Sequence, residues 1–305
     1  MEWIKAKRLC SFTTVPYAGN PAWVIIGIQP NYDEKKMMKL ARELNPLSDT
    51  TFIFPGDKES DLILGFFSGS EEIKFSGHGA VATYYAIENE GIIDLKEPTT
   101  ILKQKTKSGT QAVELRVADK KINRVTISLP PPNTISVNLE LKSVARFLGI
   151  SPIDISNTNL PVSAVQSGHP EIIVPVKSLP QLLDITPNFS LMKNYCQRFG
   201  ITGVVLFCME TNDPEANVHM RHFAPVVGIN EDPASGGAAV ALGYYLVKNG
   251  ITKAEETTRI VVEQGYSLQM PGLVYVHIYT DNNEILRTAF GGQAVMTFEG
   301  KICLP

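Results

Sequence analysis

The chain has 305 residues, 44% of them hydrophobic, which is enough for two ordinary domains with a core in each. Its 28 basic residues are scattered among 31 acidic ones, with a formal net charge of −3, so no basic face for nucleic acid is expected. No stretch approaches the roughly 18 apolar residues of a membrane span, and the start, MEWIKAKRLCSF, lacks the apolar core of a signal peptide. We therefore predict a cytoplasmic protein that binds neither nucleic acid nor membrane.

The first half of the chain predicts an α+β unit. A Gly-x-Pro turn leads into a β-branched run, and an amphipathic helical stretch follows it. Strand-like segments come next, and then a glycine cluster opens an apolar run. These segments are AGNPAWVII (18–26), DEKKMMKLARELN (33–45), TTFIF (50–54), LILGFFSGSEEIKF (62–75) and SGHGAVATYYAIENEGI (76–92).

The second half repeats the same order. Its segments are SGHPEIIVP (167–175), NFSLMKNYCQRFG (188–200), GVVLF (203–207), VHMRHFAPVVGINEDPA (218–234) and SGGAAVALGYYLVKNGI (235–251). At an offset of 159, eight of the 17 positions in the two glycine-led phrases are identical. A repeat this long indicates two duplicated domains. We place the seam in the polar stretch ADKKIN, which predicts domains at 1–118 and 119–305 and leaves open whether the last strand returns to the first domain.

The apolar runs behind the glycine clusters predict helices that are buried on all sides, each the central helix of its domain. A helix start has unpaired backbone N–H groups and a partial positive charge, so it binds anions such as carboxylates. If both starts face one cleft between the domains, they form a site for a small carboxylic acid. The alternative is that the glycines only permit close packing and the serines only cap the helices. The candidate binding residues are Ser76, Gly77, Gly79, Ser235, Gly236 and Gly237.

Two polar residues beside these clusters are candidates for acid–base chemistry. His78 stands between two glycines, and Asp232 precedes the second cluster. The alternatives are a structural histidine and a helix-capping aspartate. For the other histidines we favour packed or solvated positions; these are His169, His219, His222 and His277.

The four cysteines lie far apart and include no C-x-x-C pair, so we predict reduced core residues and no metal site. The chain also has no dinucleotide-binding glycine motif, Walker sequence or H-E-x-x-H motif. We therefore expect no cofactor.

These motifs resemble the phenazine-biosynthesis PhzF-like proteins, which share a fold with diaminopimelate epimerase and proline racemase. The matching pieces are FTTVPYAGNPAWVI (12–25), SDTTFIF (48–54), FSGHGAVA (75–82), RHFAPVVGINEDPASGGAAVAL (221–242) and GGQAVMTFEGKICLP (291–305). The resemblance implies two similar domains related by a pseudo-two-fold axis, each a curved, barrel-like mixed β-sheet around a central helix, with the site in the cleft between them. It also implies a homodimer and a role in a biosynthetic process, without implying phenazine synthesis itself.

The resemblance also implies residue roles. In the epimerase and racemase branches a cysteine precedes each glycine cluster, whereas this chain has Ser76 and Ser235, which are far weaker acids than a thiol. The PhzF-like branch uses a glutamate from a Ser-Glu-Thr segment, together with the cluster histidine and the later aspartate. Carried over, the catalytic roles fall on Asp49, His78 and Asp232, and Asn20 is expected to contribute to substrate binding.

Two departures from the family pattern bear on activity. Asp49 is one methylene shorter than the family glutamate, and a misplacement of about 1 Å can cost roughly a hundredfold in rate. Near the C-terminus the family tends to read Gly-Arg-Pro-Ser, where this chain reads QMPG (269–272), so any role of that arginine is unfilled.

The hypothesis from the sequence is a cofactor-independent isomerase that moves a proton on a small carboxylic acid. Two alternatives stay open. One is an amino-acid racemase or epimerase, and the other is a catalytically silent member that binds a ligand or a protein partner.

Overall fold

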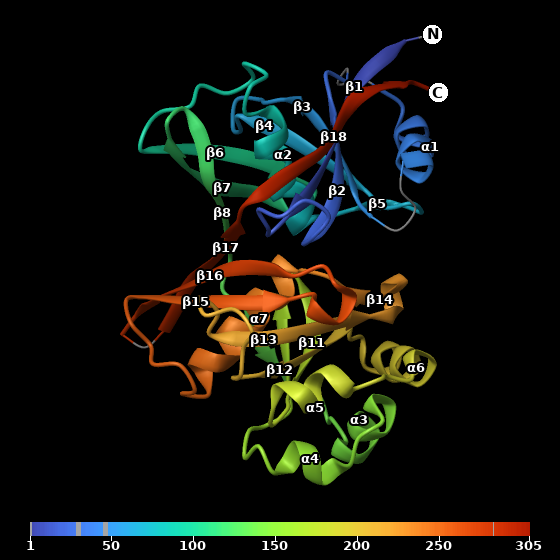
Figure 1. Ribbon diagram of the computed structural model, residues 1–305, viewed down its shortest axis with the longest axis vertical. Helices are drawn as coiled ribbons and strands as arrows, with labels where there is room; N and C mark the ends of the chain where they lie inside the picture. The colour runs from blue at the N-terminus through green and yellow to red at the C-terminus, as the bar shows by residue number, and fades with distance from the viewer. Residues whose placement is uncertain (1, 29–31, 45–47, 283) are drawn as a thin grey trace. The chain divides into compact units, whose positions relative to one another are not determined.

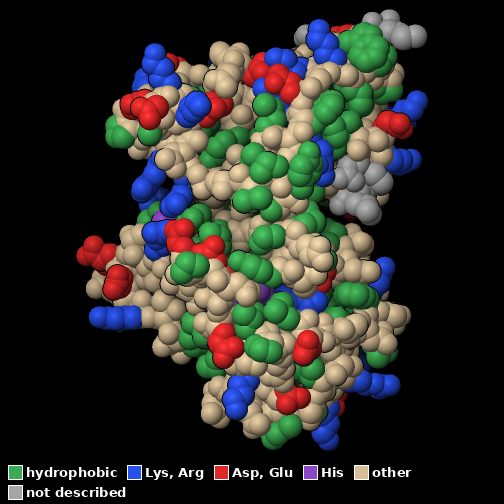
Figure 2. Space-filling view, viewed as in Figure 1, with side chains coloured by type: hydrophobic (Ala, Val, Ile, Leu, Met, Phe, Trp, Pro, Cys, Tyr) green, Lys and Arg blue, Asp and Glu red, His purple; other side chains and the backbone are tan. Residues whose placement is uncertain are grey.

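The computed structural model describes residues 2–28, 32–44, 48–282 and 284–305. The chain divides into two compact units, which we call unit 1 (1–128 with 291–305) and unit 2 (129–290). On the face seen in Figure 2, Lys and Arg side chains lie interspersed with Asp and Glu in both units. Among the described residues, no helix is long and apolar enough to cross a membrane.

Unit 1 consists mainly of strands, with one outer and one enclosed helix (Figure 1). Its strands are β1 (Trp3–Ser11), β2 (Asn20–Ile26), β3 (Thr50–Pro55), β4 (Leu62–Phe67), β5 (Glu72–Ile73), β6 (Thr99–Thr106), β7 (Gly109–Ala118), β8 (Lys121–Leu129) and β18 (Ala294–Cys303), and its helices are α1 (Glu34–Leu44) and α2 (Gly77–Ile87). The sheet is mixed: β2–β3 and β4–β6 are parallel pairs, whereas β1–β2, β3–β4 and β6–β7 are antiparallel. Each parallel pair needs a crossover, which α1 and α2 supply.

Unit 2 has the same plan with three further helices. Its strands are β9 (Asn133–Ile135), β10 (Ser163–Ser167), β11 (His169–Pro175), β12 (Gly203–Cys208), β13 (Val218–Ala224), β14 (Ile229–Asp232), β15 (Thr257–Gln264), β16 (Gly272–Asp281) and β17 (Glu284–Gly292), and its helices are α3 (Leu141–Leu148), α4 (Pro152–Ser156), α5 (Leu179–Asp184), α6 (Phe189–Phe199) and α7 (Gly236–Lys248). Strands β10 to β16 pair as β1 to β7 do, with β11–β12 and β13–β15 parallel. The repeat in the sequence is therefore a repeat of topology.

The central helices are enclosed, as their composition predicts. In α2, the six residues Ala80, Val81, Ala82, Tyr84, Ala86 and Ile87 have no exposed surface. This helix packs against β1, β2, β3 and β18, and α7 packs against β10, β11 and β16. Burial on all sides leaves the ends of each helix as the places where its unpaired backbone groups must meet polar groups.

The predicted seam after residue 118 is wrong, because Asp119 and Lys120 form a hairpin turn rather than a linker. Both have positive φ angles, 53° and 60°, the pattern that a type I′ turn requires. Strand β8 consequently folds back on β7 and belongs to unit 1 up to residue 128. The last strand, β18, also lies in unit 1, where it pairs antiparallel with β1 (Figure 1).

Replacing Lys120 with Gly should stabilise unit 1. A lysine at positive φ is strained by roughly 1–2 kcal/mol, whereas glycine adopts that conformation freely but loses more entropy on folding. We expect Lys120→Gly to raise the free energy of unfolding by about 1 kcal/mol, measured by urea denaturation. Lys121→Gly, one residue later in β8, should instead lower it by about 0.5–1 kcal/mol. Equal effects of the two variants would contradict the turn assignment.

Candidate functional site

The start of α2 is built from hydroxyl groups and glycine. Ser76 caps the helix, and its hydroxyl accepts a hydrogen bond from the Gly79 N–H at 3.2 Å. A side chain at position 79 would place its Cβ 2.8 Å from Thr51 Oγ1, so glycine is required there. Thr51 is fully buried, and its hydroxyl has no hydrogen-bond partner among the described residues. An unused hydroxyl therefore lies against the first turn of α2.

Asp49 and His78 meet at this helix start. His78 Nε2 lies 3.6 Å from Asp49 Oδ2, and its Nδ1 lies 3.4 Å from Ser76 Oγ. The side chains are only 16% and 18% exposed. The Asp49 carbonyl accepts from the Trp23 N–H, which fixes the approach to β3. The structure thus brings together two of the three residues predicted to be catalytic, as an enclosed carboxylate–imidazole pair suited to proton transfer.

Asn20 is linked to the Asp49–His78 pair through its strand partner, Ser11. It is buried at the start of β2, opposite Ser11 of β1. The Ser11 hydroxyl donates to the His78 carbonyl at 2.7 Å. The β1–β2 hairpin therefore holds the first turn of α2.

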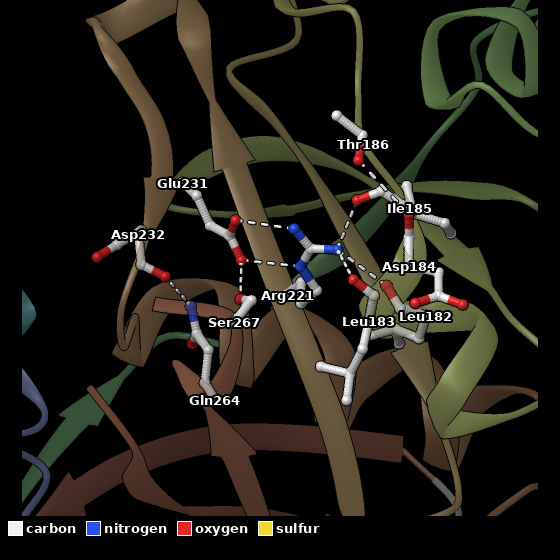
Figure 3. A network of polar contacts seen from close by, with 10 residues as sticks. All are labelled: Leu182, Leu183, Asp184, Ile185, Thr186, Arg221, Glu231, Asp232, Gln264 and Ser267. Atoms are coloured by element: carbon white, nitrogen blue, oxygen red, sulfur yellow. Dashed lines mark hydrogen bonds and ion pairs between the residues drawn. The ribbon is translucent and has the colours of Figure 1, made fainter. Parts of the chain in front are cut away.

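The start of α7 in unit 2 is joined to Asp232 by one glutamine. Ser235 caps α7 and accepts from the Ala238 N–H at 3.3 Å. The fully buried Gln264 accepts from the Ser235 N–H at 3.0 Å. It also donates to the Asp232 carbonyl at 2.5 Å (Figure 3). Gln264 was not predicted from the sequence. It fixes the spacing between the backbone of Asp232 and the helix start.

The two glycines that open α7 differ in their surroundings. A Cβ at Gly236 would lie 2.3 Å from the ring of Phe290, so close packing alone requires that glycine. A Cβ at Gly237 would be 3.6 Å from the Ser167 carbonyl, which is an ordinary contact. Close packing therefore explains why position 236 is a glycine, but it does not explain the glycine at position 237. It also does not involve the backbone N–H group of either residue.

A buried arginine ties down the strand that carries Asp232. Arg221 on β13 donates from Nε and Nη2 to the two carboxylate oxygens of Glu231 at 2.8 and 2.9 Å (Figure 3). Its Nη1 donates to carbonyls at the end of α5, those of Leu182 at 2.9 Å and Ile185 at 2.8 Å. Because Glu231 precedes Asp232, these bonds hold β14 against β13.

The QMPG segment also lies beside Asp232. The turn before it begins at Gly265, where a Cβ would lie 2.6 Å from the carbonyl of Pro233. Ser267 donates to Glu231 at 2.5 Å (Figure 3). The segment that lacks the family arginine is therefore part of the surroundings of the candidate site.

His222 forms a buried charge chain with two carboxylates. Its Nδ1 lies 3.5 Å from Asp232 Oδ2, and its Nε2 lies 3.3 Å from Glu171 Oε2. Burial opposes the charged ring, but Glu171 and Asp232 outweigh this effect and raise the pKa of His222 to about 10. The sequence leaves open whether His222 is packed or solvated, and it does not show the contact with Asp232. A possible signal was Glu171, a charged residue inside an apolar strand.

The other histidines lie elsewhere. His219 is buried 2.6 Å from Glu263, His169 is exposed at the start of β11, and His277 stacks on Tyr279. Of the four cysteines, three are buried and Cys303 is partly exposed, and all are free thiols. In the described part of the chain, no group of three or more His, Cys, Asp or Glu side chains is arranged to hold a metal ion.

Comparison with known proteins defines the class of protein to which this fold belongs. The profile of the phenazine biosynthesis-like proteins, PhzC-PhzF, matches residues 9–300. An uncharacterized isomerase of Clostridium acetobutylicum is 30% identical over 301 residues, 97% of each chain. The chain therefore belongs to the PhzF-like family, several of whose curated relatives are named as uncharacterized isomerases.

Solved structures agree with this assignment. The Bacillus anthracis PhzF-family phenazine biosynthesis protein matches with a TM-score of 0.89 and 25% identity, covering 99% of this chain and 100% of that one. A hydroxyproline epimerase from Agrobacterium vitis (TM-score 0.65, 14% identity, 98% and 92% coverage) and a methylitaconate-delta-isomerase (0.60, 12%, 99% and 95%) share the fold. The predicted α+β fold of the diaminopimelate-epimerase type is confirmed.

Replacing Arg221 should destabilise unit 2 far more than replacing an exposed arginine. Arg221→Met leaves the largely enclosed Glu231 without its charged partner and with only the Ser267 hydroxyl as a donor, and loss of such a partner typically costs about 3–5 kcal/mol. Arg259 is the matched control, because it also pairs with a glutamate and lies over an aromatic ring, but its side chain is 47% exposed. Arg259→Met should cost about 1 kcal/mol or less. Urea unfolding measures both changes in the free energy of unfolding. Similar losses in the two variants would contradict a stabilising role for the enclosed Arg221–Glu231 pair.

Proposed function

We propose that this protein is a cofactor-independent isomerase that moves a proton on a small carboxylic acid. The observation that carries the proposal is the enclosed Asp49–His78 pair at the start of a buried helix. Membership of a family with relatives named as isomerases supports the reaction class.

In this proposal Asp49 is the general base and then the general acid. Its carboxylate takes a proton from a carbon next to a carbonyl or a conjugated double bond, and the electron pair left behind delocalises into that group. The protonated Asp49 then returns the proton to a different carbon. His78, 3.6 Å away, stabilises the charge that develops or protonates a polar substituent.

Unit 2 is proposed to serve the same reaction through Asp232 and the start of α7. The backbone N–H groups of the first turns of α2 and α7 are the proposed ligands for the substrate carboxylate and for the charge formed on proton removal. Gly77, Gly236 and Gly237 supply these groups in the proposal. The N–H of Gly79, which the sequence also put forward, already donates to the Ser76 hydroxyl.

The serines support a base other than a thiol pair. Both Ser76 and Ser235 use their hydroxyl oxygens to cap helices. A hydroxyl is also a far weaker acid than a thiol of pKa about 8.5, so neither serine replaces the paired cysteines of the racemases. This favours the isomerase over the amino-acid racemase.

The test is proton–deuterium exchange followed by NMR, on a panel of small carboxylic acids that first pass a thermal-shift screen. The panel includes methylitaconate and 4-hydroxyproline types, because proteins of the same fold are named for them. We expect Asp49→Asn to abolish exchange while binding persists, and Asp49→Glu, which restores the family residue, to retain it. Asp232→Asn should lower the rate about a hundredfold or more.

Other outcomes separate the alternatives. Exchange at the α-carbon of an amino acid with inversion would indicate a racemase. Carboxylate binding without exchange under any condition would favour the silent ligand-binding protein, to which Asp49 and QMPG lend support. Exchange that survives Asp49→Asn would contradict the proposed base. The homodimer that the family resemblance implies stays a prediction.

A further inference from the structure

We propose that Glu171 and His222 are positioning residues for Asp232. Glu171 holds His222 as an imidazolium, and the imidazolium N–H at Nδ1 orients the Asp232 carboxylate for the reaction. The chemical role of Asp232 rests on the proposed function, whereas the charge chain itself is independent of it.

The register of the sheet places the three residues on one face. Glu171 of β11 pairs with Gly203 of β12, Val205 pairs with His222 of β13, and His222 pairs with Asp232 of β14. Because side chains alternate along a strand, Gly203 and Val205 share a face, and so do Glu171, His222 and Asp232. The intervening residues, including Ile172, Val204 and Phe223, belong to the core beneath α3, α5 and α6 on the opposite face.

Gly203 leaves room for the contact between Glu171 and His222. A Cβ at Gly203 would lie 2.5 Å from Glu171 Oε2, 2.8 Å from His222 Nε2 and 2.7 Å from the Phe223 carbonyl. Any side chain there would push the carboxylate away from the ring. The missing side chain at position 203 is therefore what allows Glu171 to reach His222 across one strand.

The three side chains differ in how much of their surface is exposed. Glu171 and His222 are 5% and 6% exposed, whereas the Asp232 side chain is 15% exposed. Glu171 is thus the inner end and Asp232 the outer end. A buried carboxylate without a partner is costly, so the pairing of Glu171 with His222 both stabilises Glu171 and keeps a positive charge next to Asp232.

Two carboxylates of the described residues face the His222 ring, Glu171 from β11 and Asp232 from β14. Cys196 of α6 is influenced by Glu171, but burial and that carboxylate raise the pKa of its thiol to about 12, so it stays neutral. Arg221, the next residue on β13, points to the other face, where it binds Glu231.

Unit 2 contains a second buried histidine–glutamate pair that serves as an internal control. His219 and Glu263 lie 2.6 Å apart with no exposed side-chain surface. In this pair, Glu263 also accepts hydrogen bonds from the backbone N–H groups of Asn212 and Asp213. The two pairs share their chemistry, but only Glu171–His222 continues to a candidate catalytic residue.

The first test is an NMR titration of the full chain labelled with ¹⁵N in its histidine rings, with no ligand added. We expect the His222 ring, assigned with His222→Gln, to keep both protons through pH 8 and to titrate near pH 10. Glu171→Gln should weaken proton binding to His222 by about tenfold or more, whereas Glu263→Gln should leave it unchanged. Titration of wild-type His222 near its ordinary pKa of about 6.5, or no change in Glu171→Gln, would overturn the proposal.

The second test reads positioning directly. The side-chain carboxyl carbon of Asp232, assigned with Asp232→Asn, should change its ¹³C shift in His222→Gln and in Glu171→Gln, but not in His219→Gln. If that resonance stays in place, His222 does not position Asp232, and the inference fails even though the proposed reaction could still hold.

The third test uses the proton-exchange rate on whichever carboxylic acid the panel identifies. Glu171→Gln should lower kcat about tenfold to a hundredfold, with little change in KM, and should add no further loss in an Asp232→Asn background. Fully additive losses would overturn the proposal. Failure of every acid to exchange would contradict the proposed function alone, because the two ligand-free measurements still decide the charge chain.

Discussion

Two helices that are apolar around nearly their whole circumference constrain this fold more than any other feature. Such a helix cannot lie on a surface, so α2 and α7 are each enclosed by the strands of their own unit. Enclosure removes water from the sides of the helix, and the unpaired N–H groups of its first turn must then meet capping hydroxyls, carboxylates or a ligand. For that reason, the candidate polar residues of each unit lie around the start of its central helix.

The two units share a topology, but the polar side chains around their central helices differ. In unit 1 the imidazole comes from the helix itself, at His78. The equivalent position of the second phrase is Gly237, and unit 2 supplies its imidazole from the sheet, at His222. Both rings lie beside an aspartate, Asp49 or Asp232. Topology therefore preserved a carboxylate–imidazole arrangement while its source changed.

Local pattern predicts the elements well, because the repeated phrases and the 3.6-residue and two-residue periodicities are local properties. The seam was misplaced because a short polar pair reads alike in a linker and in a hairpin turn, and only the pairing of β7 with β8 distinguishes them. The contact of His222 with Glu171 spans 51 residues and depends on Gly203 between them. No local pattern encodes that register, and the same holds for Arg221, whose acceptors include carbonyls of α5.

The two aspartates are held with very different firmness, and this difference suits different roles. Asp232 follows a glutamate bound to Arg221, has its carbonyl bonded to Gln264, and lies beside a charged ring. Within the described residues, Asp49 is held by one backbone bond from Trp23 and by an ion pair with His78. A group that accepts and returns a proton must be stable in both protonation states and reach two carbon positions, so it benefits from light restraint. A group that orients the substrate works best when it is fixed in place, since small misplacements are costly in rate. The packing around the two residues therefore supports proton transfer by Asp49 and orientation by Asp232.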